Sequence, residues 1–152
     1  MATVLGDEID VLAKAKKAIA GDYAPSDSEA YMSEPQLDYY RRLLQEWKKL
    51  ILSAAKDTLQ SLQDGPIREP DLNDRASSET DWGIELRTRD RQRKLIAKID
   101  SALRRIEEGE YGYCEVTGEP IGLGRLSARP IATMTVEAQE AHERREKISR
   151  DD

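Results

Sequence analysis

One apolar stripe constrains the fold of this chain more than any other feature of its sequence. Between residues 37 and 62, apolar residues recur at alternating intervals of three and four. They are Leu37, Tyr40, Leu44, Trp47, Ile51, Ala54, Ala55, Leu59 and Leu62. This spacing keeps one face of an α-helix apolar and, sustained over several heptads, is typical of a coiled-coil seam. Ser33 and Pro35 suit the start of this helix, and Gly65-Pro66 should end it.

A second stripe predicts a second long helix that begins between residues 74 and 78 and runs to Glu108. Its members are Leu95, Ile99, Ala102 or Leu103, and Ile106. Two long helices joined by a short connection pack antiparallel, and both stripes are too narrow for a thick core. We therefore expect a long antiparallel coiled-coil hairpin over residues 34–108, with its tip near 66–77, projecting from a small globular domain.

The rest of the chain is expected to form that mainly α globular domain. Residues 1–33 should supply its N-terminal part, with a helix over 7–20. Residues 109–134, dense in glycine and other turn residues, predict a small irregular knob, and residues 135–152 predict a charged C-terminal helix. The chain has no Phe and only 5% aromatic residues, which argues against a large β or α/β core.

Composition also excludes several functions and locations. The net charge of −6 argues against non-specific DNA binding, because phosphate contacts need a basic surface. A single cysteine excludes an intrachain disulfide and favours a reducing, cytoplasmic location. The start of the chain lacks the apolar core of a signal peptide, and the apolar run 50–52 is far too short to cross a bilayer.

Two charged clusters could carry function. At the hairpin tip, Asp71 and Asp74 could reach a metal ion or a basic group on a partner, although acidic residues there are also common helix caps. On the second helix, five of the eight residues from 87 to 94 are basic. Arg87, Arg91, Lys94 and Lys98 share one helix face, which suits a phosphate-bearing ligand or is simply the solvated face of the coiled coil.

The knob around Cys114 has the spacing of a zinc knuckle, but Thr117 stands where a second cysteine would be. A neutral hydroxyl is a poor zinc ligand, and His142 is the only histidine, so Cys114 is expected to be a small buried residue. The chain also lacks a glycine-rich phosphate loop after a strand and any set of nucleophile, base and orienting residue. We therefore expect no enzymatic activity.

These three clusters, in this order, resemble the DksA/TraR family of bacterial transcription factors. The likeness runs from residue 31 to the final helix. It is carried by Tyr31-Met32, Gln36-Leu37, Arg41-Arg42-Leu43-Leu44, residues 71–76, 86–91 and 93–96, Gly112-Tyr113-Cys114-Glu115, Ile121-Gly122, Arg125-Leu126 and Ala128-Arg129-Pro130. Residues 1–30 contribute little to it.

The resemblance implies a function that composition alone does not. Members of the family bind RNA polymerase directly rather than DNA, and their coiled-coil finger enters the secondary channel. There they modulate initiation at ribosomal RNA and amino-acid promoters in the stringent response, together with ppGpp. The resemblance further implies a cytoplasmic monomer that needs no membrane.

The resemblance also assigns site residues. The tip positions that approach the polymerase active site match Asp71, Asp74 and Ala76. The interface for ppGpp and polymerase matches Arg91, Leu95, Lys98 and Arg129, in line with the basic face described above.

Two departures from the family pattern change these expectations. The four zinc-cysteine positions match Cys114, Thr117, Thr135 and Ala138, so zinc is not expected and packing around Val116, Met134 and Val136 should hold the knob. A family lysine of the ppGpp site is replaced by Gln139. The loss of one charged contact should weaken ppGpp binding by about 1–3 kcal/mol.

Two other functions fit parts of the sequence. A different class of secondary-channel factor uses acidic tip residues to hold a catalytic magnesium ion for transcript cleavage, and the two tip carboxylates alone allow this. A structural coiled-coil adaptor with no role at polymerase would need only the hairpin.

Overall fold

The computed structural model describes residues 4–64 and 72–151, with side chains over 10–64 and 79–149. Its helices are α1 (Val4–Ala18), α2 (Glu34–Asp64), α3 (Leu72–Glu108), α4 (Leu123–Ala128) and α5 (Val136–Asp151). Within these described ranges the only β pairing is an isolated bridge between Tyr113 and Pro120. The same ranges hold no helix with the length and apolar character that a membrane span requires. The mainly α class is therefore confirmed.

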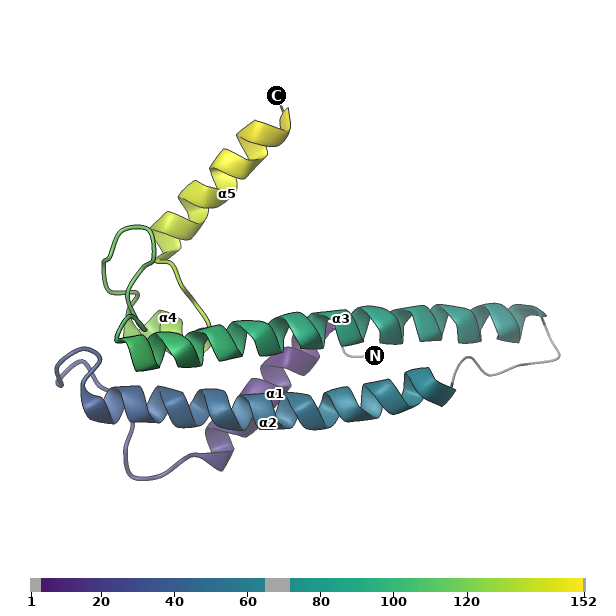
Figure 1. The fold of residues 1–152 in the computed structure, drawn as a ribbon, viewed down its shortest axis with the longest axis horizontal. Helices are drawn as coiled ribbons and strands as arrows, with labels where there is room; N and C mark the ends of the chain where they lie inside the picture. Colours follow the sequence, from purple (N-terminus) through teal and green to yellow (C-terminus); the bar gives the residue numbers. More distant parts are fainter. Residues whose placement is uncertain (1–3, 65–71, 152) are drawn as a thin grey trace. The chain divides into compact units, whose positions relative to one another are not determined.

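Helices α2 and α3 form the antiparallel hairpin that the two stripes predict (Figure 1). Each unit holds a contact that pairs the two helices: in unit 1 Trp82 Nε1 donates to the Leu62 carbonyl at 3.3 Å, and in unit 2 Arg41 Nε lies 3.5 Å from Glu107 Oε1. The buried seam residues are Tyr40, Leu43, Leu44, Trp47, Ile51, Thr58 and Leu62 on α2, with Leu95, Ile99, Ala102 and Ile106 on α3. Leu59, expected in the seam, is exposed, because the repeat passes from Ile51 through Thr58 to Leu62.

Several element boundaries differ from the predicted ones. α1 begins at Val4 rather than residue 7, and α3 begins at Leu72 rather than at 74–78. The short helix α4 was not predicted, because the knob was expected to be irregular. α2 starts where predicted, but the Ser33 hydroxyl is buried without a hydrogen bond. Gln36 acts there instead, accepting from the Met32 amide at 2.8 Å and donating to the Ser26 carbonyl at 3.1 Å.

α3 ends in a glycine motif that leads into the knob. Gly109 has a positive φ of 76°, its amide donates to the Ile106 carbonyl, and the Glu110 amide donates to the Arg105 carbonyl at 2.9 Å. This Schellman arrangement satisfies carbonyls that the last helical turn leaves open, and glycine adopts the left-handed conformation without steric strain. The chain therefore turns sharply after Glu108.

Contacts divide the chain into two compact units. Unit 1 consists of Met1–Ala20 with Gln45–Ile99, and unit 2 consists of Gly21–Leu44 with Asp100–Asp152. Unit 2 is thus discontinuous in sequence. The division of the N-terminal part differs from the expected boundary at residue 33. Helix α1 groups with residues 45–99 in unit 1, and its residues Leu12 and Ala15 are buried.

Tyrosines build the core of unit 2. The ring of Tyr111 lies 5.7 Å from that of Tyr40, and its hydroxyl donates to the Pro130 carbonyl at 2.7 Å. Tyr31 links the segment before α2 to the knob, because its hydroxyl donates to the Gly112 carbonyl at 2.7 Å and accepts from the Gly122 amide at 2.9 Å. These contacts fix the knob against the start of α2 within this unit.

Candidate functional site

The predicted tip residues fall at or beside the part of the chain that the structure does not describe. Asp71 lies outside the described residues. Asp74 and Ala76 belong to the first turns of α3, and their side chains lie outside the described range. The roles of all three therefore remain predictions.

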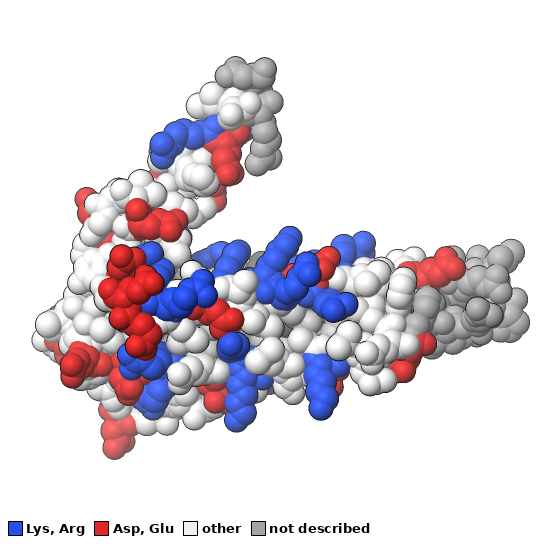
Figure 2. Space-filling model, in the orientation of Figure 1, with Lys and Arg blue, Asp and Glu red and all other residues white. Residues whose placement is uncertain are grey.

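The basic face of α3 is present in unit 1. Arg87, Lys94 and Lys98 are exposed there, and Figure 2 shows Lys and Arg side chains gathered over the middle of the long helices. Arg93 forms an ion pair with Asp90 at 3.4 Å, in which both side chains are largely exposed. Such exposed pairs bind weakly, so they leave the positive potential of this face largely available to an anion.

The other predicted interface residues lie in different surroundings. Leu95 is buried in the seam rather than displayed on the surface. Arg91 is half-buried, and its Nη2 donates to the Thr88 hydroxyl at 3.5 Å. Arg129 is exposed directly after α4 and belongs to unit 2, whereas Arg91, Leu95 and Lys98 belong to unit 1.

The four positions that match zinc cysteines form a hydrogen-bonded turn and a helix cap. The Cys114 amide donates to the Glu119 carbonyl and the Gly118 amide to the Cys114 carbonyl, both at 2.8 Å. The Thr117 hydroxyl accepts from the Glu119 amide at 3.2 Å. The Thr135 hydroxyl accepts from the Ala138 amide at 3.2 Å, which makes Thr135 the N-cap of α5. Thus both threonine hydroxyls already serve backbone groups.

This donor set does not fit zinc. Structural zinc sites use four thiolate or imidazole ligands, and here a single thiolate stands with two hydroxyls and one methyl group. Within the described ranges, no group of three or more His, Cys, Asp or Glu residues is placed to hold a metal ion. The chemistry of the knob must therefore be understood from hydrogen bonds and packing.

The packing of the knob differs from the expected pattern. Thr135 and Ala138 are buried, in agreement with the expectation that they fill space. Thr117 is exposed, and so are Val116 and Val136, which were expected to pack around it. Val116 and Thr117 are exposed because the turn from 114 to 119 is held by its own hydrogen bonds, which leave its outer side chains in water.

Cys114 is buried, and hydrogen bonds to its sulfur favour the thiolate form. Burial alone would raise the pKa of its thiol, yet hydrogen bonds from the Thr117 side chain and from the amides of Thr135, Thr117 and Val116 outweigh that effect. Together they lower the pKa of Cys114 from 9.0 to about 7. Hydrogen bonds to the sulfur lower its pKa because they stabilise the negative charge of the thiolate.

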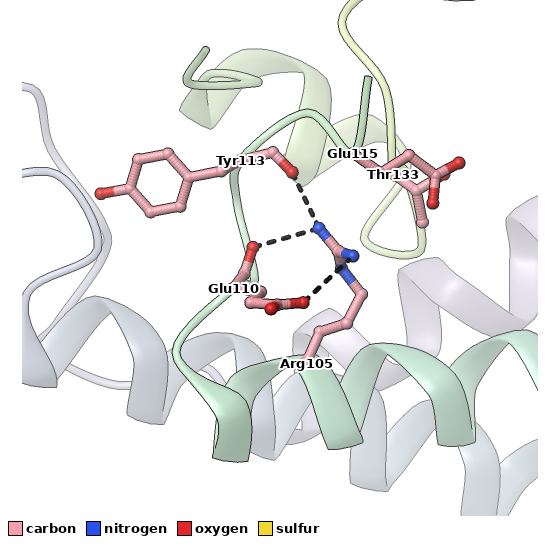
Figure 3. Close-up of polar contacts among 5 residues, drawn as sticks. All are labelled: Arg105, Glu110, Tyr113, Glu115 and Thr133. Carbon is pink, nitrogen blue, oxygen red and sulfur yellow. Dashed lines mark hydrogen bonds and ion pairs between the residues drawn. The ribbon is translucent and has the colours of Figure 1, made fainter. Parts of the chain in front are cut away.

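Arg105 is a site residue that the sequence analysis missed. Figure 3 shows its guanidinium directed into the loop that follows α3. Its Nη2 donates to the carbonyls of Glu110 at 3.1 Å and Tyr113 at 2.8 Å, and its Nη1 lies 3.8 Å from Glu110 Oε2. The side chain is only 16% exposed. One arginine thus holds the chain directly before Cys114.

A second link joins the two halves of the knob. The Glu115 amide donates to the Thr133 carbonyl at 2.8 Å, and the Thr133 hydroxyl donates to Glu115 Oε1 at 3.3 Å. Both residues appear in Figure 3 beside the arginine contacts. Arg125 adds to this link, because its Nε donates to the Met134 carbonyl at 2.9 Å. The residues directly before Thr135 are therefore hydrogen-bonded to Glu115, the neighbour of Cys114, and to Arg125 of α4.

Two family models match this chain, one over the hairpin and one over the knob and the start of α5. Residues 36–106 match the family model of the DnaK suppressor protein DksA, N-terminal domain, and residues 109–144 match the prokaryotic dksA/traR C4-type zinc finger. The chain is 62% identical to the RNA polymerase-binding transcription factor DksA of Caulobacter vibrioides, covering 86% of this chain and 92% of that protein. It is 42% identical to the protein of the same name from Escherichia coli, over 86% and 87%.

A solved structure agrees with these matches. Transcription factor DksA2 from Pseudomonas aeruginosa superposes with a TM-score of 0.69 and 39% sequence identity, covering 92% of this chain and 98% of that one. The likeness extends over hairpin and knob alike, since nearly all of both chains is covered.

Proposed function

This chain belongs to the DksA family, and on that premise we propose that it binds RNA polymerase directly and regulates transcription initiation. The observation that carries the proposal is the 62% identity to a polymerase-binding transcription factor over 131 residues. The antiparallel α2–α3 hairpin supports it, because it supplies the long, narrow element that the proposed mode of binding requires.

We propose that the hairpin enters the secondary channel of polymerase with its tip toward the active site. Asp71, Asp74 and Ala76 are the residues assigned to that contact. Carboxylates at this position would act on the charges of the catalytic region without any chemistry of their own, so the protein is proposed to be a regulator and not an enzyme.

The proposed effector is ppGpp, bound at the interface with polymerase. Arg91, Lys98 and Arg129 would provide positive charge for its phosphates, and the basic face of α3 supports this assignment. Leu95, buried in the seam, would act by holding that face in place. Gln139 is neutral and its Nε2 donates to Glu143 Oε1 at 3.1 Å, so it would not replace a lysine contact. We therefore propose a weakened ppGpp response.

The remaining parts of the proposal follow from membership of the same family. The protein would act in the cytoplasm as a monomer, without contacting DNA or a membrane. Zinc would be dispensable, because Arg105, Thr117 and Thr135 satisfy the backbone around the former ligand positions.

A pull-down with core RNA polymerase tests the proposal most simply. The full-length chain, purified and treated with a chelator, should retain polymerase on an affinity resin. An unrelated acidic coiled-coil protein serves as the control. Failure to retain polymerase would favour the structural-adaptor function instead. If it binds, adding ppGpp to a promoter assay with Lys98→Ala as the matched variant tests the effector assignment.

The alternative function at the same channel is stimulation of transcript cleavage. The pair Asp71 and Asp74 favours it, since two carboxylates can hold a magnesium ion. Adding the protein to a backtracked transcription complex separates the two functions: shortening of the RNA supports cleavage, and unchanged RNA length supports regulation of initiation.

A further inference from the structure

The seam between α2 and α3 changes from apolar to polar inside unit 1. Between Ile51 and Leu62 on α2, and between Trp82 and Leu95 on α3, no apolar side chain is fully buried. The half-buried apolar residues there are Ala54, Ala55 and Ile84. The buried or half-buried polar residues there include Thr58, Thr88, Arg91 and Gln92, and we name these four the polar stretch.

Hydrogen bonding within the polar stretch is incomplete. Arg91 Nε and Gln92 Oε1 are buried without a hydrogen-bond partner among the described residues. The hydroxyl of Thr58 donates to the Ala54 carbonyl and that of Thr88 to the Ile84 carbonyl, each at 3.0 Å and each within its own helix. Such bonds do not join the two helices, and buried polar atoms without partners favour a state in which water reaches them.

The helices meet again on the far side of the polar stretch, toward residues 65–71. There Trp82 Nε1 donates to the Leu62 carbonyl at 3.3 Å, and Leu62 is buried. That carbonyl lies in the last turn of α2, where carbonyls have no partner within the helix. We name this contact the indole latch.

Gly83, directly after the tryptophan of the latch, weakens the same part of α3. A Cβ added at this position would meet no described atom within 4 Å, so close packing does not account for the glycine. Glycine inside a helix favours the unfolded chain, because it has more backbone freedom to lose on folding than any other residue. Helix α3 is therefore weakly held between the polar stretch and the latch.

We propose that the loop-side segment, residues 59–64 of α2 with 79–87 of α3, opens and closes as one unit in the free protein. The polar stretch forms its boundary, and the indole latch closes it. Opening lets water reach Arg91 Nε and Gln92 Oε1, while the apolar seam from Leu95 to Ile106 stays packed. The proposal concerns the protein alone and does not depend on polymerase binding.

Hydrogen exchange of the full-length chain, followed by mass spectrometry, tests this proposal. Amides of the loop-side segment should exchange together and faster than those of residues 95–106. Gln92→Leu removes an unpartnered buried oxygen and extends the apolar seam, so it should slow exchange of the loop-side segment by about ten-fold. The matched control is Gln45→Leu at an exposed position of α2, which should leave that exchange unchanged.

Two further variants keep the test decisive if Gln92→Leu disturbs folding. Gly83→Ala should also slow exchange of the loop-side segment, because alanine fits the open space and favours the helix. Trp82→Phe removes the latch donor and should speed it. Loop-side amides that exchange as slowly as those of residues 95–106 would overturn the proposal. So would exchange that neither Gln92→Leu nor Gly83→Ala slows.

Discussion

Side-chain hydrogen bonds stabilise the knob of this chain, whereas zinc fingers are stabilised by a bound metal ion. Arg105 reaches across the glycine turn after α3 and donates to the Glu110 and Tyr113 carbonyls. Thr135, at a position that matches a family zinc cysteine, caps α5. Cys114 keeps hydrogen-bond donors around its sulfur that stabilise a thiolate. These contacts stabilise the knob through side-chain and backbone hydrogen bonds.

The ionisation of Cys114 can be measured directly. Because it is the only cysteine, thiolate absorbance near 240 nm reports its titration alone. The titration midpoint should lie at pH about 7 rather than 9.0. Thr117→Val removes the side-chain hydrogen bond and should move the midpoint upward. A midpoint near 9 in the native protein would contradict this explanation.

The same pKa shift predicts how stability depends on pH. The folded state lowers the pKa of Cys114, so the stabilisation from its thiolate is complete above the unfolded value of 9.0 and is lost as pH falls through about 7. The unfolding free energy of the wild type, relative to Cys114→Ala, should therefore rise between these pH values. Urea unfolding of both proteins across that window measures it, and a flat difference would count against the shift.

Arg105→Lys tests the arginine clamp. Lysine keeps the charge but lacks the planar fork that reaches two carbonyls, so the unfolding free energy should fall by about 1–3 kcal/mol. The matched control is Arg104→Lys, whose exposed side chain should change stability by less than about 0.5 kcal/mol. Equal effects of the two substitutions in denaturant unfolding would show that the clamp is unimportant.

At the scale of elements, the hairpin follows from its apolar repeat, and the knob follows from contacts that no repeat encodes. The seam from Tyr40 to Ile51 and from Leu95 to Ile106 was predictable, because a period near 3.5 leaves a clear pattern. The start of α3 was missed because its first turns are polar. Helix α4 was missed because its six residues are too few to show a period.

The candidate site was less predictable than the hairpin. Family likeness located Cys114, Thr117, Thr135 and Ala138, but it did not show that the hydroxyls of two of them bind backbone amides. The role of Arg105 depends on the path of the loop after Gly109, which hydrophobic spacing does not encode. An arginine in the last helical turn before a glycine-rich loop was the one available signal.

The hydroxyl of Thr135 stabilises the start of α5 as its N-cap. Thr135→Ala removes the acceptor for the Ala138 amide and should lower the unfolding free energy by about 1 kcal/mol. Thr135→Ser keeps the hydroxyl and should restore most of that loss. If serine destabilises the protein as much as alanine does in the same unfolding assay, the hydroxyl is not acting as a cap.

At the scale of the whole molecule, a net charge of −6 conceals a local basic face. Five of the eight residues from 87 to 94 are basic, and this face lies on the hairpin that we propose contacts polymerase. An acidic chain of this kind is poorly suited to DNA, whereas its basic face suits an anionic effector. We therefore propose that regulation acts through a protein partner and a nucleotide rather than through promoter DNA.

The most direct test of this account is transcription from a ribosomal RNA promoter by purified RNA polymerase, with the full-length chain or its Asp74→Asn variant and without added zinc. We predict that the wild-type chain changes transcript yield. Asp74→Asn should abolish most of that change while still competing for polymerase, because it removes one charge and little volume. An Asp74→Asn protein that binds polymerase and regulates as the wild type does would contradict the account.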